Sequence, residues 1–190
     1  MERLMFRNLR ADEIDIRVSE VREWGVSLLL YKDARCDMAI LDETVGPENW
    51  QRRHDAIDGV LYCSVGIMAE TAQGGTEWVW KQDCGTAGSF EAEKSAASDA
   101  FKRACFCWGI GRELYTAPRI TIKPAQANVK RNNNGKDVCY DRFSVAKAVV
   151  EEHEIKALAV RNDTTGQIVF TWMKPGYEPE AQGKGAGDDE

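Results

Sequence analysis

Hydrophobic and polar positions follow a helical period in two segments of the N-terminal part of the chain. Residues 9–23 (LRADEIDIRVSEVRE) place Leu9, Ile16 and Val21 among many charged residues, which predicts an acidic amphipathic helix. Residues 34–45 (ARCDMAILDETV) predict a second helix. The Gly-Pro pair that follows residue 45 is typical of a helix end.

The pattern then changes from helix to strand. Residues 58–70 (DGVLYCSVGIMAE) and 76–84 (TEWVWKQDC) are rich in Val, Ile, Tyr and Trp. The segment between them, TAQGG, predicts a hairpin turn with glycine at its tip. Residues 49–57 (NWQRRHDAI) predict a third strand just before this hairpin.

A long helix is predicted over residues 89–108, directly after the strands. Ser89 is a suitable N-cap, and Glu91 and Glu93 complement the positive end of the helix dipole. The middle of the segment is made of alanine and serine. These small side chains suit close packing of the helix on a sheet.

The last third of the chain returns to strands after a basic segment. Residues 119–137 end in Asn-Asn-Asn-Gly before the final Lys-Asp and predict a flexible linker. Residues 140–150, 154–163 and 167–172 predict a small β-meander. Residues 175–190 are acidic and contain glycine, which predicts a disordered tail.

Composition and cysteine usage indicate an ordinary globular protein. The 190 residues are 43% hydrophobic and 29% charged, enough for one domain with a real core, with or without an appendage. No apolar run approaches the roughly 20 residues that span a bilayer, and the first residues lack a signal-peptide core. We therefore expect a cytosolic protein in which the six cysteines are small buried hydrophobes rather than disulfides.

The net charge of −6 is unevenly distributed. The segment 175–190 holds five acids and one lysine, a net charge of −4, whereas 119–136 holds five basic residues and no acid. The acidic total therefore does not exclude a nucleic-acid partner. The tail could compete with DNA for the basic segment, present its last acids to a partner, or only keep the protein dissolved.

Motifs for catalysis or nucleotide binding find little support. The glycines of GIGREL (109–114) follow a predicted helix, whereas a dinucleotide fingerprint opens one after a strand. No G-x-x-x-x-G-K-[ST] motif occurs, which argues against an ATP-driven recombinase or helicase. His54 and His153 lack the partners of a catalytic triad.

Two adjacent cations, Lys102 and Arg103, lie near the end of the long predicted helix. Around the helix they fall about 100° and 200° from the stripe of Phe101, Ala104 and Trp108, so neither faces the core. A solvated helix face is one explanation, because cations near a C-terminus complement the dipole. A phosphate contact is the other.

The order of the motifs resembles the Rad52 (Rad22) family of single-strand annealing proteins, including its phage recombinase members. That family has a tyrosine before a helix, E-x-x-G-x-x-x-W, a β-hairpin, a helix ending [ST]-D-A-[LF]-K-R-A, and a glycine-rich exit. The matching residues are Tyr31, Glu43, Gly46, Trp50, Lys94, Ala97, Ser98, Asp99, Ala100, Phe101, Lys102, Arg103, Ala104, Gly109, Gly111 and Tyr115. The resemblance covers residues 20–116 and leaves the last third of the chain outside it.

The resemblance implies that Lys102 and Arg103 line a positive groove around an oligomeric ring and hold the backbone of single-stranded DNA. The family also uses an arginine in the helix after the tyrosine, and Arg35 lies one position from that match. A further family arginine is replaced here by Phe106. The candidates to compensate for this loss are Arg52, Arg53 and Lys81.

Trp78 and Trp80 alternate with Val79 and are expected on one face of their strand. They could belong to the core or a subunit interface, or they could stack on bases. Exposed edges of a short sheet also favour oligomerisation, because neighbouring subunits can pair them.

Together these features predict an α+β protein that assembles into an oligomeric ring. Its β-β-β-α annealing core covers residues 1–118. A basic linker (119–137), a small C-terminal β extension (138–174) and an acidic disordered tail (175–190) follow.

The predicted function is ATP-independent binding and annealing of complementary single-stranded DNA in homologous recombination and double-strand-break repair, without catalysis, cofactor or metal. The expected partners are single-stranded DNA, copies of the chain itself, and a host or phage single-strand-binding protein or exonuclease, but no membrane. We expect a phage or prophage protein acting in the cytoplasm of a bacterial host. The alternatives are protection of single strands or DNA ends without annealing, and a metal- or cysteine-dependent enzyme using Cys105, Cys107 and His54.

Overall fold

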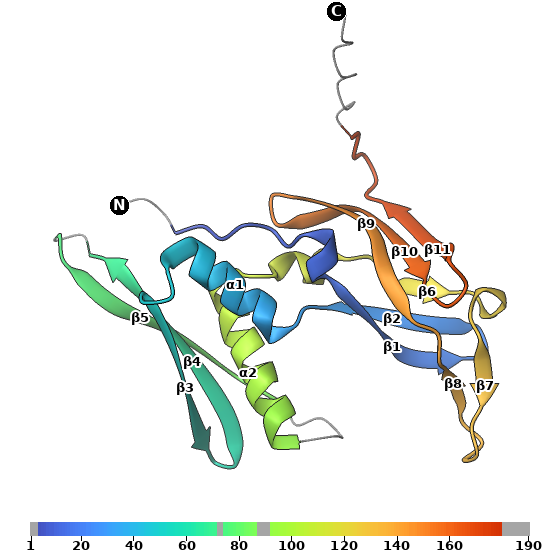
Figure 1. Cartoon of the computed structure of the whole chain (residues 1–190), viewed down its shortest axis with the longest axis horizontal. Helices are drawn as coiled ribbons and strands as arrows, with labels where there is room; N and C mark the ends of the chain where they lie inside the picture. The colour runs from blue at the N-terminus through green and yellow to red at the C-terminus, as the bar shows by residue number, and fades with distance from the viewer. Residues whose placement is uncertain (1–3, 72–73, 87–91, 180–190) are drawn as a thin grey trace, which may run out of the picture.

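The computed structural model describes residues 4–71, 74–86 and 92–179 (Figure 1). Two α-helices and eleven strands lie within these ranges. The helices are α1 (Ala34–Val45) and α2 (Ala92–Trp108). The strands are β1 (Asp15–Arg22), β2 (Gly25–Tyr31), β3 (Trp50–Ile57), β4 (Val60–Glu70), β5 (Thr76–Cys84), β6 (Ile120–Ile122), β7 (Val129–Arg131), β8 (Asp137–Cys139), β9 (Phe143–Glu151), β10 (Glu154–Asn162) and β11 (Gln167–Met173).

The larger sheet has six antiparallel strands in the order β11-β10-β9-β1-β2-β6. Its two halves, β11-β10-β9 and β1-β2-β6, are joined by the single residue pair Asp15 and Ser144. The edge strands β6 and β11 contact each other, so the sheet is nearly closed, like a barrel. Its interior is filled by side chains such as Val26, Ile122 and Val160, all fully buried.

The smaller sheet consists of β3, β4 and β5 in that order, all antiparallel. Helix α2 packs on one face of this sheet through Phe101, whose ring stacks on Trp50 at 6.1 Å between centroids. The backbone approaches closely where the small residues of α2 meet Gly85, because a Cβ there would lie 2.1 Å from the Ala96 carbonyl oxygen. The expected packing of a thin helix on a sheet is confirmed.

Helix α2 stands between the two sheets (Figure 1). The order β3-β4-β5-α2 gives the predicted β-β-β-α arrangement, and the α+β class is confirmed. Helix α1 also forms as predicted, with the Asp33 carboxylate accepting hydrogen bonds from the backbone N–H groups of Arg35 and Cys36. Within the described ranges, neither helix is long and apolar enough to cross a membrane.

The predicted helix over residues 9–23 is wrong. A short 3-10 helix (η1, Ala11–Glu13) is followed by β1, which forms a hairpin with β2. The physical reason is a period of two: Ile16 and Val18 are half-buried, and the residues between and beside them are exposed. An alternating segment can bury these β-branched residues only as a strand paired with β2.

The prediction of a flexible linker over residues 119–137 is also wrong. Strand β6 pairs with β2, and its Ile120 and Ile122 are buried in the core. A 3-10 turn (η3, Pro124–Gln126) and the hairpin of β7 and β8 complete the segment. Two isoleucines on one face of a three-residue strand outweigh the loop signals around them.

The three strands predicted for the last third of the chain are confirmed as β9, β10 and β11. They share their sheet with β1, β2 and β6, so the predicted boundaries at residues 118 and 138 cut across one sheet. The predicted N-cap Ser89, Glu91 and the tail from residue 180 onward lie outside the described residues.

Candidate nucleic-acid interface

Helix α2 divides its side chains between the core and a charged outer surface. Phe101, Ala104 and Cys105 are fully buried, whereas Lys102 is half-buried and Arg103 is exposed. The helix ends where Gly109 adopts φ +113° and Arg112 donates hydrogen bonds to the carbonyl oxygens of Phe106 and Cys107. These contacts cap the C-terminus and fix the last turn of α2.

A groove of about 420 Å³ lies between α2 and the outer face of the β1–β2 hairpin, and we call it the α2–β2 groove. It is also lined by the short 3-10 helix η2 (Arg112–Thr116) and by the glycine before it. The lining residues are Arg17, Leu29, Leu30, Tyr31, Lys32, Asp99, Lys102, Arg103, Phe106, Gly111, Leu114 and Tyr115. Cations therefore come from both walls, and the rings of Tyr31, Phe106 and Tyr115 line the groove with them.

Arg103 is held in place by Asp83 of β5, with 3.1 Å between guanidinium and carboxylate. Burial opposes the charge on Arg103, but the contact with Asp83 together with the nearby Tyr115 and Asp99 raises the pKa of Arg103. The arginine side chain is still 46% exposed. An exposed ion pair of this kind adds little stability. Asp83 orients the guanidinium, and the exposed part of the side chain is accessible to a phosphate.

A buried ion pair of Lys32 and Asp37 lies beside the groove. Burial raises the pKa of Asp37 to about 6, against the opposing effect of the Lys32 and Lys102 charges. The lysine stem passes directly over Gly111, where a Cβ would lie 2.3 Å from Lys32 Cε. Gly111 therefore leaves the space through which Lys32 reaches Asp37.

Residues 31–134 match the family model of the Rad52/22 double-strand break repair proteins. The chain belongs to the Rad52/22 family. Its resemblance to a protein named single-stranded DNA-binding protein DdrA, from Deinococcus radiodurans, is 38% identity over 94 residues. That match covers 48% of this chain and 42% of DdrA, so the chain spans less than half the length of this relative.

Of the six cations predicted for the site of this Rad52/22 protein, Lys102 and Arg103 line the α2–β2 groove. Arg35 projects from the first turn of α1 with a 90% exposed side chain, 4.0 Å from Asp33. Arg52 lies over the buried Phe101 ring at 4.6 Å, and Lys81 donates to the Cys107 carbonyl oxygen at 3.1 Å.

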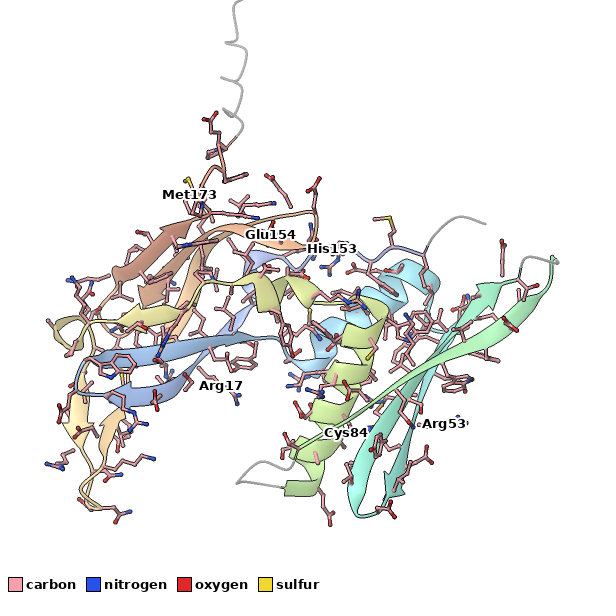
Figure 2. All side chains as sticks on the ribbon, turned by 180° about the vertical axis from the view of Figure 1, so that it is seen from behind. Arg17, Arg53, Cys84, His153, Glu154 and Met173 are labelled. Carbon is pink, nitrogen blue, oxygen red and sulfur yellow. The ribbon has the colours of Figure 1, made fainter. Side chains whose placement is uncertain are left out.

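Arg53 lies on the face of the smaller sheet that points away from α2. Side chains alternate between the two faces along β3, and the residues on either side of Arg53 face the helix. Figure 2 places Arg17 and Arg53 on opposite sides of α2. The structure therefore brings together Lys102, Arg103 and Arg17 in one groove, and it separates Arg53 from them.

Trp78 and Trp80 share one face of β5, as predicted, with their ring centroids 6.1 Å apart. The guanidinium of Arg53 lies 4.4 Å from the Trp80 ring centroid. Gly66 of β4 lies beneath this ring, and a Cβ there would meet it at 2.8 Å. This tryptophan face is the side of the smaller sheet opposite α2.

Sequence reasoning missed three lining residues of the groove, Arg17, Tyr31 and Tyr115, as DNA-contact candidates. Arg17 was concealed by the incorrect helix over residues 9–23, because its position opposite α2 exists only in a β-hairpin. The tyrosines could be noted only as family matches, since their exposure to a groove depends on tertiary structure.

The residues of the enzyme alternative lie in separate surroundings. Cys105 is fully buried, and burial raises the pKa of its thiol well above its usual range. A ring nitrogen of His54 lies 3.1 Å from the Ala97 carbonyl oxygen, and Cys107 Sγ lies 4.0 Å from that of Gln82. Among the residues that the structure describes, no three His, Cys, Asp or Glu side chains form a metal-binding cluster.

Proposed function

We propose that this Rad52/22-family protein binds single-stranded DNA in the α2–β2 groove and anneals complementary strands without ATP, in recombination and double-strand-break repair. The observation that carries the proposal is the convergence of Lys102, Arg103 and Arg17 from two walls of one groove. Membership of a repair family and similarity to a protein named for single-stranded DNA binding support it.

The chemistry of the groove fits this role. Lysine and arginine bind phosphate oxygens, which carry no sequence information. A strand held by its phosphates keeps its base edges available to a complementary strand. Pairing of complementary strands is itself favourable, so the protein only has to extend each strand and offset the repulsion between phosphates.

The first experiment removes the two cations of α2. Lys102→Ala with Arg103→Ala should weaken binding of different oligonucleotide sequences to a similar extent. It should also reduce the slope of log affinity against log salt by about 0.7 for each phosphate that the variant no longer neutralises. Fluorescence anisotropy over a salt series measures both quantities.

A matched control removes the same charge elsewhere. Arg142→Ala with Lys147→Ala takes two exposed cations from the β9 region, outside both the groove lining and the basic segment. The control should keep its affinity and salt slope to within a small factor. An equal loss of affinity in both double variants would contradict the assignment of the groove and indicate a general electrostatic effect.

A second experiment separates annealing from protection. Pairing of two labelled complementary oligonucleotides should be accelerated by the protein in the presence of a chelator and without nucleotide. Binding that shields a strand from nuclease but does not accelerate pairing would favour the protection alternative. A requirement for a divalent metal would favour the enzyme alternative.

We also propose that the protein assembles into a ring. Strands β3 and β5 are the edges of the smaller sheet, and unpaired edges are templates for pairing with a second copy. Particle images of the purified protein test this directly. The bacterial cytoplasm, a phage or prophage origin, and a host or phage single-strand-binding protein or exonuclease as partner stay predictions.

A further inference from the structure

The α2–β2 groove contains a pair of aromatic rings whose role the cations do not explain. The rings of Phe106 and Tyr115 lie 4.4 Å apart between centroids with an interplanar angle of 52°. Phe106 comes from the last turn of α2 and is half-buried, whereas Tyr115 comes from η2 and is 73% exposed. We call these two residues the ring pair.

The exposed ring of Tyr115 stands on a rigid support. Two residues before it, the fully buried Glu113 accepts a 2.6 Å hydrogen bond from the backbone N–H of Leu9. Directly after it, the Thr116 hydroxyl accepts a 2.9 Å bond from the backbone N–H of Ile155 and donates to the Glu113 carbonyl oxygen. The backbone on both sides of Tyr115 is thus fixed, so its ring is presented to solvent in a defined position.

Two cations lie beside the ring pair. Arg112, whose N–H groups are bound to the last carbonyl oxygens of α2, has its guanidinium carbon 5.7 Å from the Phe106 ring centroid. Arg103 is three residues before Phe106, so the two side chains are neighbours on the helix surface. A single nucleotide can therefore contact a cation with its phosphate and an aromatic ring with its base.

We propose that the ring pair is a stacking platform for one base of the bound single strand, next to the phosphate contacts of Lys102 and Arg103. The inference rests on the proposed function and adds a base contact to it. Aromatic rings stack on the faces of all four bases, so such a platform tolerates any sequence. Stacking also leaves the base edge open, which is compatible with pairing to a complementary strand.

The test compares two probes of equal length, an oligothymidylate and a strand of abasic sugar phosphates. Both carry the same charge, but only the first can stack. Wild-type protein should bind the oligothymidylate more tightly. Tyr115→Ala should weaken binding of the oligothymidylate by about 5- to 150-fold. It should leave binding of the abasic strand and the salt slope unchanged.

Two control variants distinguish stacking from loss of structure. Tyr115→Phe keeps the ring and should keep the affinity. Tyr140→Ala removes another exposed tyrosine, 65% accessible and outside the groove lining, and should also keep it. In wild-type protein, ultraviolet light should crosslink a strand that contains iodouridine to Phe106 or Tyr115. This measurement does not depend on the folding of any variant.

The failures of the two proposals are distinguishable. Equal affinity of wild-type protein for the two probes, or a weakening by Tyr115→Ala no larger than that by Tyr140→Ala, would overturn the stacking platform and leave the phosphate contacts intact. Binding of neither probe would overturn the proposed function together with the platform. A crosslink that maps only to the tryptophan face of the smaller sheet would also overturn the platform.

Discussion

At the scale of single residues, the buried pair of Lys32 and Asp37 shows how burial opposes a charge. The Lys32 side chain is 6% exposed and that of Asp37 is fully buried. Asp37 Oδ2 has no hydrogen-bond partner among the described residues. A carboxylate in this position is stabilised by Lys32 but penalised by the loss of water. The two effects balance at a pKa of about 6 for Asp37.

This raised pKa makes stability depend on pH in a defined direction. The folded state holds the Asp37 proton up to about pH 6, whereas the unfolded chain releases it near the ordinary value of 3.8. The contribution of Asp37 to the free energy of unfolding is therefore fully present below pH 3.8 and is lost as the pH rises through 6. Urea unfolding at a series of pH values measures it.

The Asp37→Asn variant is the reference for that measurement, because it keeps the shape of the side chain and removes its titration. The stability of the wild type relative to this variant should rise as the pH is lowered from about 7 to about 4. A difference that stays constant over this range would contradict the raised pKa.

Gly111 offers a second residue-scale prediction. Gly111→Ala should destabilise the protein in two ways, because its φ is +77° and the new Cβ would displace the Lys32 stem. Gly59→Ala has the same φ of +77°, and no atom of the described residues lies within 4 Å of the added Cβ, so it shows only the backbone cost, about 1–2 kcal/mol. The midpoint of thermal unfolding should be lower for Gly111→Ala than for Gly59→Ala. Equal midpoints would contradict the contact with Lys32.

At the scale of elements, α2 depends on Phe101 for its position. The ring is fully buried, stacks on Trp50 and lies under the Arg52 guanidinium. Phe101→Ala should lower the free energy of unfolding by about 3–5 kcal/mol, the usual cost of such a cavity. Phe101→Leu should cost less, and denaturant titration of the two variants measures the difference; equal values would contradict the packing.

The elements also show what the sequence could and could not reveal. Strands β3, β4 and β5 and helices α1 and α2 were predictable, because their periodicity is long and their turn and cap residues are local. The segment that contains β1 resembles a helix in the sequence, because Leu9 and Ile16 are seven residues apart among charged residues; pairing with β2 gives it a period of two. The three residues of β6 are too few for any periodic signal, and only the sheet explains them.

The candidate site follows the same division. Lys102 and Arg103 could be found because they interrupt an apolar helix within one local segment. Arg17 and Tyr115 could not be assigned to a groove, because their neighbours there come from α2 and from β2, remote in the sequence. A groove between two elements is a property of tertiary structure, so its second wall is absent from any local pattern.

At the scale of the whole molecule, the distribution of charge affects the affinity for single-stranded DNA. The net charge of −6 includes the net charge of −4 in residues 175–190. Deleting these residues should tighten single-strand binding at low salt, where charges act over the longest range, and the gain should vanish at high salt. Anisotropy titrations of the full and shortened chains at two salt concentrations measure this effect.

The control for the deletion keeps the length of the tail and removes only its charge. Replacing the five acids by Asn or Gln should reproduce the gain of the deletion; they are Glu178, Glu180, Asp188, Asp189 and Glu190. Coinciding titrations of the full and shortened chains at low salt would eliminate competition between tail and DNA, and would favour partner recruitment or solubility.

The single residue pair between β1 and β9 has a consequence for how the molecule opens. Cooperative units in a folded chain often follow continuous networks of hydrogen bonds. The ladder of the six-stranded sheet is thinnest between β1 and β9, where Asp15 and Ser144 form the pairing. Separation of the β9-β10-β11 meander from the β1-β2-β6 half would break the shared core packing and the Thr116–Ile155 hydrogen bond, but each half would keep its own ladders. Amide protons of the meander would then exchange with solvent as one group, at a free energy different from that of the amides beneath the groove.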